Sequence, residues 1–299
     1  MARPPSGAPW RASARCRLAG MSEHHTHPPV PLLVIGGGAM AQAILRGALD
    51  AGALDPGRIV VCDPDATKHD ALRALGVRVE HATASAMDAA HPGAVMLLCV
   101  KPQMLATVAE EIGARRFDGL AVSILAGARS HRVREALGGT ARVVRVMPNT
   151  PAQLRMGVSA VALGAGATPE DADLAASLFA AVGAVVRIDE GMMDAFTALA
   201  GSGPAYVFYL AGAMQRAALE MGFDATQGDE IVRATIEGAA ALLARDRGVT
   251  ADELRARVTS RKGTTQAATD AMDEAGVMDA IVRAVLAARD RGAALSEQV

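Results

Sequence analysis

The feature that most constrains the fold is a glycine triplet at residues 36–38, which stands between an apolar run and a helical pattern. The preceding run, Leu32–Ile35, is continuously apolar, as strands buried on both faces are. With Ala41 the loop reads G-x-G-x-x-A, in which the glycines permit a tight turn and a close phosphate, and the alanine keeps helix and strand together. The loop therefore predicts a dinucleotide site at a helix N-terminus, with contacts from Ile35, Gly36, Gly37, Gly38, Ala39 and Met40.

Short apolar runs alternate with helical patterns through the first two thirds of the chain. Each run is bounded by Gly, Pro or Asp, and strand and helix in alternation indicate a doubly wound α/β domain with a Rossmann-type parallel sheet. We place this dinucleotide-binding domain at residues 30–190. The predicted strands are Leu32–Ile35, Ile59–Cys62, Val95–Val100, Leu120–Leu125, Val143–Met147, Val158–Leu163 and Val185–Ile188.

After about Gly191 the strand signals stop, and residues 191–299 are predicted to be entirely helical. This region is rich in alanine and has several apolar faces, so we expect it to need a second copy of the chain to bury them. It is therefore predicted to be a substrate-binding and dimerisation domain. The predicted helices are Met192–Ala200, Ala205–Met221, Ala225–Asp246, Ala251–Val258 and Thr265–Val285.

The first 29 residues are basic and have no acidic residue before Glu23. A leader of this composition is typical of a transit peptide, or of a start codon assigned too early. We favour Met21 as the true start and expect residues 1–29 to be a disordered extension.

The overall composition limits the partners and the compartment. Thirty basic and 32 acidic residues give a net charge of −2, which offers no electrostatic reason to expect nucleic acid or an anionic membrane. The three cysteines are an odd number and two lie in apolar runs, so we expect them reduced, in the cytoplasm. No apolar stretch approaches the roughly 20 residues that span a bilayer. No bound metal is expected.

Asp63 ends the second apolar run, where a carboxylate would meet the adenosine ribose of the cofactor. A carboxylate there accepts hydrogen bonds from the ribose hydroxyls and repels a 2′-phosphate, which favours NADH. Lys68 and His69 lie close in sequence and would partly offset that repulsion. Alternatively, Asp63-Pro64-Asp65 is only a turn that begins a helix.

Four later motifs follow the glycine loop in a fixed order. They are Val100-Lys101-Pro102-Gln103, Met147-Pro148-Asn149-Thr150-Pro151, Ala200-Gly201-Ser202-Gly203-Pro204-Ala205-Tyr206, and Val258-Thr259-Ser260 with Gly263-Thr264-Thr265. From about Leu32 to about Val282 the chain thereby resembles the pyrroline-5-carboxylate reductase family. The resemblance implies reduction of 1-pyrroline-5-carboxylate to L-proline with NADPH or NADH, the last step of proline biosynthesis. It also implies a homo-oligomer, at least a dimer and further an assembly of dimers.

The resemblance also implies roles for individual residues. Thr197 matches the candidate catalytic residue that hydrogen-bonds the ring nitrogen of the substrate. The implied cofactor contacts are Val100, Lys101, Pro102, Ala126, Gly127 and Asn149. The implied substrate contacts are Ser202, Gly203, Ser260, Gly263, Thr264 and Thr265.

Each of these roles has a plainer alternative. Lys101 would otherwise be a solvated surface lysine, and Asn149 part of a rigid turn between two prolines. The Thr197 hydroxyl would equally bond a backbone carbonyl one turn back. The loop at 260–265 would be only a glycine-containing helix start.

The sequence departs from the family pattern near the substrate. The family loop reads Ser-Pro-Gly-Gly where this chain has Ser260-Arg261-Lys262-Gly263, and acidic residues are usual at the positions of Gly212 and Arg216. A rival assignment is a 3-hydroxyacid dehydrogenase, but that chemistry needs a catalytic lysine in the helical half, where Lys262 is the only lysine. A second rival is a non-catalytic protein that senses or assembles around a dinucleotide.

Overall fold

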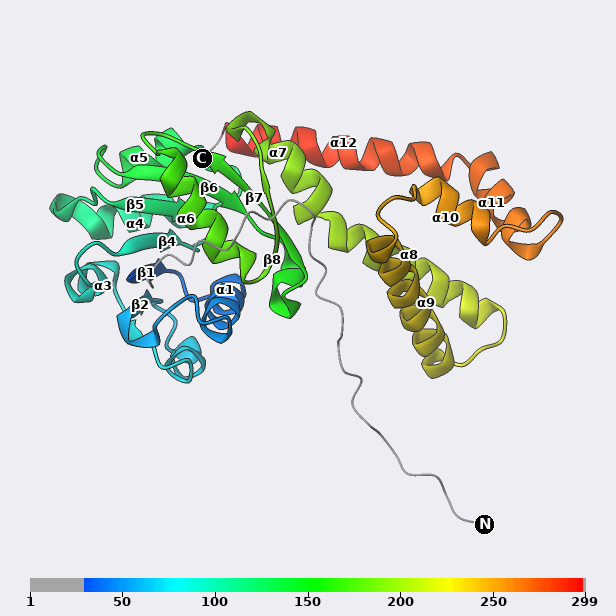
Figure 1. Cartoon of the computed structure of the whole chain (residues 1–299), viewed down its shortest axis with the longest axis horizontal. Coiled ribbons are helices and arrows are strands. Elements are labelled where there is room, and N and C mark those ends of the chain that lie inside the picture. The colour runs from blue at the N-terminus through cyan, green and yellow to red at the C-terminus, as the bar shows by residue number, and fades with distance from the viewer. Residues whose placement is uncertain (1–29, 298–299) are drawn as a thin grey trace, which may run out of the picture.

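The computed structural model describes residues 30–297, so the predicted extension at residues 1–29 and its Met21 start lie outside the described residues. Within residues 30–297 the strands form one eight-stranded sheet in the order β3-β2-β1-β4-β5-β6-β7-β8 (Figure 1). The strands are β1 (Leu32–Ile35), β2 (Ile59–Cys62), β3 (Arg78–Glu80), β4 (Val95–Leu98), β5 (Leu120–Ser123), β6 (Arg142–Met147), β7 (Gly157–Leu163) and β8 (Gly183–Arg187).

The predicted α/β class is confirmed, but the sheet is not parallel throughout. Strands β1 to β6 are parallel, whereas β7 pairs antiparallel with β6 and β8 follows the direction of β7. Only residues 148–156 connect β6 to β7, and a parallel return needs a crossover of about a dozen residues or more. The prediction of a parallel sheet was therefore wrong at this edge. The short loop between β6 and β7 could have indicated the antiparallel pairing from the sequence.

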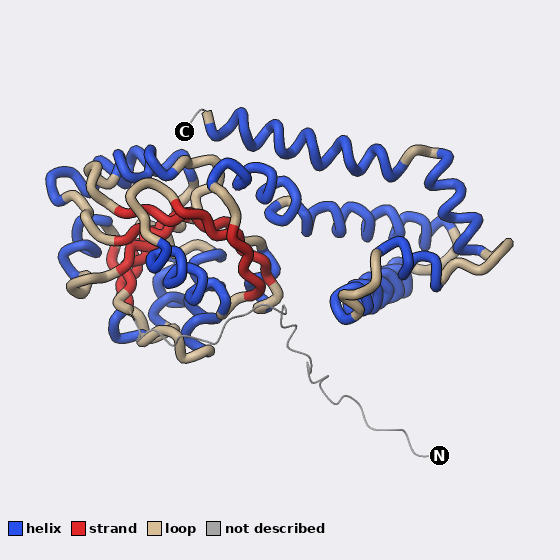
Figure 2. The backbone as a smooth tube through the Cα atoms, turned by 45° about the horizontal axis from the view of Figure 1, so that its top comes forward, coloured by secondary structure: helices blue, strands red, loops and turns tan. Residues whose placement is uncertain are grey.

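Helices cover both faces of the sheet, which Figure 2 shows as a curved layer. One face carries α1 (Ala39–Asp50), α2 (His69–Arg73) and α6 (Pro169–Ala180), and the other carries α3 (Thr83–Ala89), α4 (Leu105–Ile112) and α5 (Ser130–Ala136). Strand β3 was not predicted, because a three-residue edge strand shows too little periodicity.

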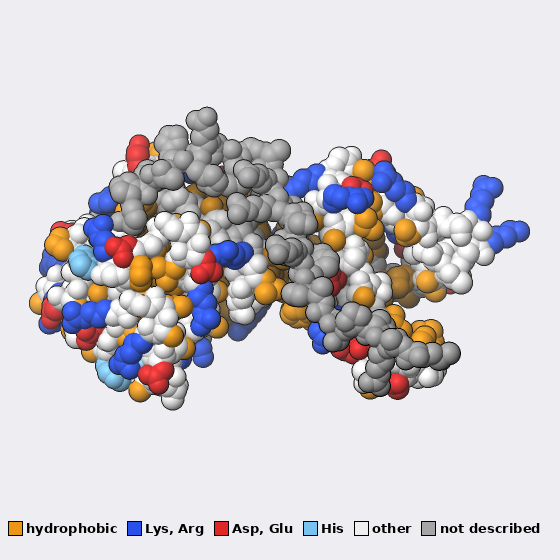
Figure 3. Space-filling view, turned by 60° about the horizontal axis from the view of Figure 1, so that its bottom comes forward, with side chains coloured by type: hydrophobic (Ala, Val, Ile, Leu, Met, Phe, Trp, Pro, Cys, Tyr) orange, Lys and Arg blue, Asp and Glu red, His pale blue; other side chains and the backbone are white. Residues whose placement is uncertain are grey.

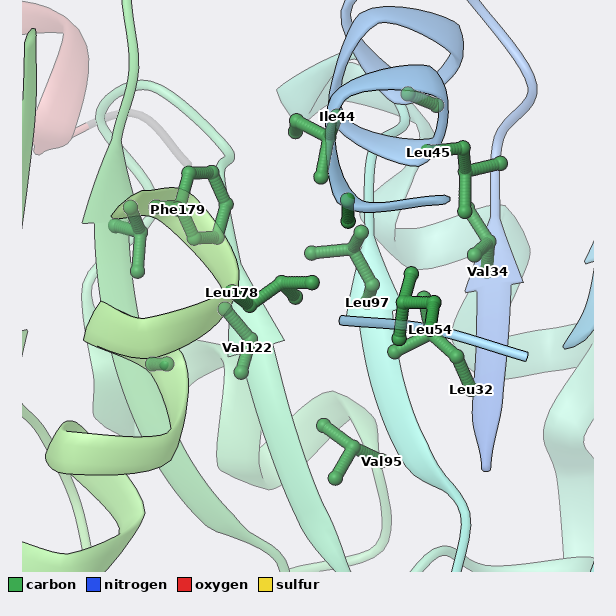
Figure 4. Close-up of a cluster of buried hydrophobic side chains, with 14 of the residues drawn as sticks. Leu32, Val34, Ile44, Leu45, Leu54, Val95, Leu97, Val122, Leu178 and Phe179 are labelled. Atoms are coloured by element: carbon green, nitrogen blue, oxygen red, sulfur yellow. The ribbon is translucent and has the colours of Figure 1, made fainter. Parts of the chain in front are cut away.

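The core follows the two-residue period of the strands. In β1, Leu32 and Val34 lie in the cluster under α1 and α6, while Leu33 and Ile35 lie in the cluster under α4 and α5. Figure 4 shows the first cluster, to which α1 contributes Ile44 and Leu45 and α6 contributes Leu178 and Phe179. The central strands are buried on both faces, which is why they read as unbroken apolar runs.

The remaining described helices form an extended arm beside the sheet. They are α7 (Met193–Phe196), a π-helical turn (Thr197–Gly201), α8 (Gly203–Glu220), α9 (Ala225–Arg245), α10 (Ala251–Arg257), α11 (Thr264–Glu274) and α12 (Val277–Ser296). Capping boxes formed by Asp224 with Gln227 and by Thr250 with Glu253 start α9 and α10. Nowhere in residues 30–297 is a helix both long and apolar enough to cross a membrane.

The single helix predicted at Thr265–Val285 was wrong, because the chain breaks at Gly276. That residue has a φ of +67°, a left-handed conformation that glycine adopts without steric cost. The break turns α12 back toward the sheet (Figure 1). There the Ser296 hydroxyl donates to the Asp194 carboxylate at 3.0 Å, so the last turn of α12 is fastened to α7.

Many large apolar side chains on the arm are exposed, and Figure 3 shows part of this surface. Exposed apolar side chains in such number indicate an interaction site. The most exposed members on α8 and at its end are Phe208, Tyr209, Leu219 and Met221, and α12 adds Met278, Ile281 and Val282.

A charged junction joins the arm to the sheet at Glu190. Its carboxylate accepts hydrogen bonds from the Ser130 N–H at 2.7 Å and the Ser130 hydroxyl at 2.6 Å, and it pairs with the buried Arg145 guanidinium at 3.3 Å. Burial by itself opposes the charge of Glu190, but the hydrogen bonds from Ser130 and the attraction of Arg145 outweigh it. They hold the pKa of Glu190 below its usual range.

We expect Glu190→Gln to destabilise the protein in a pH-dependent way. A carboxyl whose pKa is lowered by folding stabilises the fold above its unfolded pKa, and this contribution is lost as pH falls through the folded pKa. The loss should be about 1 kcal/mol at neutral pH and should vanish in acid. Urea unfolding at fixed protein concentration measures it, with the exposed Glu110→Gln on α4 as control. An equal loss at both pH values would contradict the assignment.

Candidate active site

The glycine loop contacts the end of β4, at the point where the strand order reverses. Gly36 has a φ of +98°, and a Cβ there would lie 2.8 Å from the Cys99 carbonyl carbon and 2.9 Å from the Val100 nitrogen. No side chain fits, so the close approach requires glycine. Ligands of open α/β sheets bind in the crevice at such a switch point between neighbouring strands, here β1 and β4. The structure thus brings together two motifs that the sequence assigned to the cofactor.

Gly38 leaves the start of α1 open. It is the N-cap of the helix and makes no side-chain cap hydrogen bond, and a Cβ built on it would meet nothing within 4 Å. The first turn of α1 contains no acidic residue, Ala39 is exposed and Met40 is half-buried. An uncapped helix N-terminus with free space before it fits the pyrophosphate of a dinucleotide.

Asp63 braces the glycine loop. Its carboxylate is almost fully buried and accepts hydrogen bonds from the Gly37 N–H at 2.8 Å and the Asp65 N–H at 2.9 Å. The Lys68 ammonium lies 3.1 Å from both of its oxygens. Burial opposes the charge of Lys68, but its bonds to Asp63 raise its pKa above the ordinary value. The carboxylate therefore has a structural task in addition to any contact with ribose.

Two other predicted cofactor segments lie at the same edge of the sheet. Lys101 is exposed and precedes a 3-10 turn at Pro102–Met104, directly after the Val100 that faces the glycine loop. The turn at Ala126 and Gly127 follows β5, where Gly127 has a φ of +76°. A Cβ on Gly127 would lie 3.5 Å from the Ser296 hydroxyl, so the end of α12 packs against this turn.

Asn149 links three elements. Its amide nitrogen donates to the Ala200 carbonyl at 3.1 Å, and its amide oxygen accepts from the Val158 N–H at 2.9 Å. The side chain is almost fully buried. It therefore joins the end of β6 to the π-helical turn and to the start of β7. This structural role is closer to the alternative given above, in which Asn149 is part of a rigid turn between two prolines.

Thr197 begins the π-helical turn, and its hydroxyl donates to the Met193 carbonyl one turn back at 2.8 Å. With its proton committed, the oxygen is left as a hydrogen-bond acceptor. The Thr197 carbonyl accepts from the Ser202 N–H, and Gly203 is the first residue of α8. Ser202 and Gly203 thus lie one short turn away from Thr197.

The predicted substrate loop lies elsewhere in the chain. Ser260 to Thr265 connects α10 to α11 at the far end of the arm from the glycine loop (Figure 1). Gly263 is the N-cap of α11 without a side-chain cap, which leaves N–H groups free beside Thr264 and Thr265. Lys262 has a φ of +57°, so a residue with a side chain adopts the left-handed conformation that glycine adopts most readily.

Two side chains with no role predicted from the sequence also support the site. The Gln42 amide donates to the Gly37 carbonyl at 3.0 Å, and the Tyr206 hydroxyl donates to the Ala198 carbonyl at 2.8 Å. Tyr206 is the last residue of the Ala200–Tyr206 motif. Its hydrogen bond to Ala198 could have been expected only from its position on the first turn of α8. No cluster of His, Cys, Asp and Glu able to hold a metal ion occurs in the described part of the chain.

The fold and the site define a dinucleotide-dependent oxidoreductase with a helical dimerisation domain. Residues 190–295 match the family model described as pyrroline-5-carboxylate reductase dimerisation, and residues 31–127 match the model described as NADP oxidoreductase coenzyme F420-dependent. The pyrroline-5-carboxylate reductase of Methanosarcina acetivorans is 35% identical over 266 residues, which cover 88% of this chain and 97% of that one. The chain therefore belongs to the pyrroline-5-carboxylate reductase family.

Other relatives agree. The Haemophilus influenzae pyrroline-5-carboxylate reductase is 37% identical over 260 residues, covering 86% of this chain and 94% of its own. A solved pyrroline-5-carboxylate reductase from Coxiella burnetii is 30% identical with a TM-score of 0.79, covering 90% of this chain and 99% of that chain. The Plasmodium falciparum enzyme, solved with NADP bound, has a TM-score of 0.78 at 21% identity, with coverage of 89% and 98%.

We expect Asp63→Ser to weaken the binding of both cofactors, because the Gly37 N–H loses a charged acceptor. Preference should also shift toward NADPH by roughly tenfold, since repulsion of the 2′-phosphate disappears. Fluorescence titration with NADH and NADPH measures both effects. Asp70→Ser is the control, because that carboxylate is 98% exposed and pairs with Arg73 on the surface. An unchanged NADH-to-NADPH ratio would place Asp63 away from the ribose.

Proposed function

We propose that this chain reduces 1-pyrroline-5-carboxylate to L-proline with NADPH or NADH, in the cytoplasm, as the last step of proline biosynthesis. The observation that carries the proposal is the hydrogen bond from Asn149 to Ala200. It fastens the turn that contains Thr197 to the carboxyl edge of the sheet where a dinucleotide would bind. We also propose a domain boundary at about residue 190, between a dinucleotide-binding domain at 30–190 and a helical domain at 191–299.

The residues of the chain suit a reaction on a protonated cyclic imine. A bound nicotinamide supplies the hydride for the imine carbon. Thr197 accepts a hydrogen bond from the ring N–H, because its own proton is held by the Met193 carbonyl. It thereby orients the ring and favours its protonated form, so no separate general acid is needed. Val100, Lys101 and Pro102, with Ala126 and Gly127, line the cofactor side.

The carboxylate site requires a second copy of the chain. Ser260 to Thr265 lies far from the glycine loop within one chain, whereas the exposed apolar faces of α8 and α12 are suited to a partner copy. We infer that the loop of one copy, with Ser260, Gly263, Thr264 and Thr265, meets Ser202 and Gly203 of the other. The free N–H groups at the start of α11, together with the hydroxyls of Ser260, Thr264 and Thr265, then bind the substrate carboxylate. Dimers further associate into a larger assembly.

Purified protein should oxidise NADH or NADPH when given pyrroline-5-carboxylate and should release proline. The fall in absorbance of the reduced cofactor measures its oxidation, and proline analysis measures the product released in the same turnover. A 3-hydroxyacid given with the oxidised cofactor is the control for the rival chemistry. A protein that binds the cofactor but never turns over this imine would refute the proposal, whatever its fold.

Replacing both Thr264 and Thr265 by Val should mainly weaken imine binding. Each lost hydrogen bond to a charged group is worth about 1.5–3 kcal/mol, so the imine KM should rise by roughly tenfold or more. The cofactor KM should hardly change, because the cofactor lies against the sheet. The matched control is Thr235→Val, whose hydroxyl bonds the Ile231 carbonyl within α9. A normal imine KM with impaired cofactor binding would assign this loop to the wrong site.

A further inference from the structure

The turn at Thr197–Gly201 differs from an α-helix in its hydrogen-bond register. The Ser202 N–H bonds the Thr197 carbonyl, five residues back, at 2.8 Å. In an α-helix it would bond Ala198 instead. The shift of one residue leaves carbonyls of the turn without their usual main-chain donors, and such an arrangement persists only where other groups satisfy them.

Tyr206 satisfies the first of these carbonyls. Its hydroxyl, on the first turn of α8, reaches back to donate to the Ala198 carbonyl at 2.8 Å. In an α-helix the Ala198 carbonyl would accept from the Ser202 N–H, which here bonds the Thr197 carbonyl instead. A phenol is a suitable donor here because its rigid ring carries the O–H far from its own backbone.

Asn149 satisfies a second carbonyl, that of Ala200. The donors four and five residues further on are unavailable, since Pro204 has no N–H and the Ala205 N–H bonds the Ser202 carbonyl at 2.9 Å. The Asn149 amide donates at 3.1 Å in their place. The turn is therefore held from α8 on one side and from the end of β6 on the other.

We propose that Tyr206 and Asn149 are positioning residues that hold Thr197–Gly201 in the π-helical register. Neither side chain needs to touch the substrate. Together they fix the direction of the Thr197 hydroxyl and the distance of Ser202 from the sheet. The proposal rests on the proposed function, because it gives the turn its task in the reduction of the imine.

The neighbourhood of the turn explains why the register matters. A Cβ on Gly201 would lie 3.2 Å from the Met147 side chain, so the turn has little room beside the end of β6. Asn149 is itself held by the Val158 N–H. A return to the α register would rotate Ser202 and α8 relative to Thr197, and thus separate groups proposed to bind one ligand.

Tyr206→Phe removes one hydroxyl and nothing else, and Ser177→Ala is its control. Ser177 is exposed on α6, and its hydroxyl bonds the Leu174 carbonyl within that helix, away from the apolar face of α8. We expect Tyr206→Phe to lower kcat with the imine about fivefold, the effect of one neutral hydrogen bond. The NADH dissociation constant should stay within about twofold, because the cofactor contacts remain, whereas the imine KM should rise modestly, because Ser202 is less firmly held beside Thr197. Hydrogen exchange at the Ser202 amide should accelerate about fivefold, while amides of β1 keep their protection.

Asn149→Asp provides a second, independent variant. The carboxylate keeps an acceptor for the Val158 N–H but loses the donor to Ala200. It should lower kcat and accelerate Ser202 exchange as Tyr206→Phe does. In the double variant the two effects should be less than additive, because either loss alone releases the same turn.

Several results would overturn the proposal. One is a Tyr206→Phe enzyme equal to Ser177→Ala in both kcat and Ser202 exchange. Another is an equal fall in stability, NADH affinity and kcat, which would indicate a general structural role. Strictly additive effects in the double variant would also contradict it. Hydrogen exchange and NADH binding need no imine, so a wild-type protein inactive on this imine would refute the proposed function while the register is still tested.

Discussion

The close approach of Gly36 to the Cys99–Val100 backbone is the contact on which the rest of the arrangement depends. It fixes β1 against β4 at the switch point, and it opens the crevice in front of α1. Asp63 and Gln42 then hold Gly37 by hydrogen bonds, and Lys68 pairs with the Asp63 carboxylate. Any side chain at position 36 would push these groups apart, so a single missing Cβ sets the geometry of the nucleotide edge.

Much of this fold could be read from local patterns. Central strands such as Leu32–Ile35 and Ile59–Cys62 were predicted with their observed bounds, because burial on both faces leaves no polar residue in them. Strand β3 was not predicted because it has only three residues and lies at the edge of the sheet. The reversal of β7 was missed although the loop at 148–156 is too short for a parallel return. Gly276 was passed over because one glycine within a long helical pattern is often tolerated.

The site was predictable as a set of segments but not as a set of contacts. The order of the motifs identified Asn149 and Thr197. The residues adjacent to them in sequence do not predict that Asn149 bonds Ala200, which is 51 residues away. The π-helical register follows from Pro204 only once α8 and β6 are placed in space. The distance between Thr264 and the glycine loop likewise depends on how the whole chain folds. Contacts and distances between segments far apart in sequence are set by the tertiary structure, so local sequence patterns do not predict them.

The position of the Ser260–Thr265 loop has a genetic consequence under the two-copy site proposed here. One copy with a ruined glycine loop and another with a ruined 260–265 loop would each be inactive alone. A mixed dimer of the two would contain one site built from both intact halves, beside one built from both damaged halves. Two recessive alleles of this kind would therefore complement each other within a single cell, whereas two alleles that damage the same half would not.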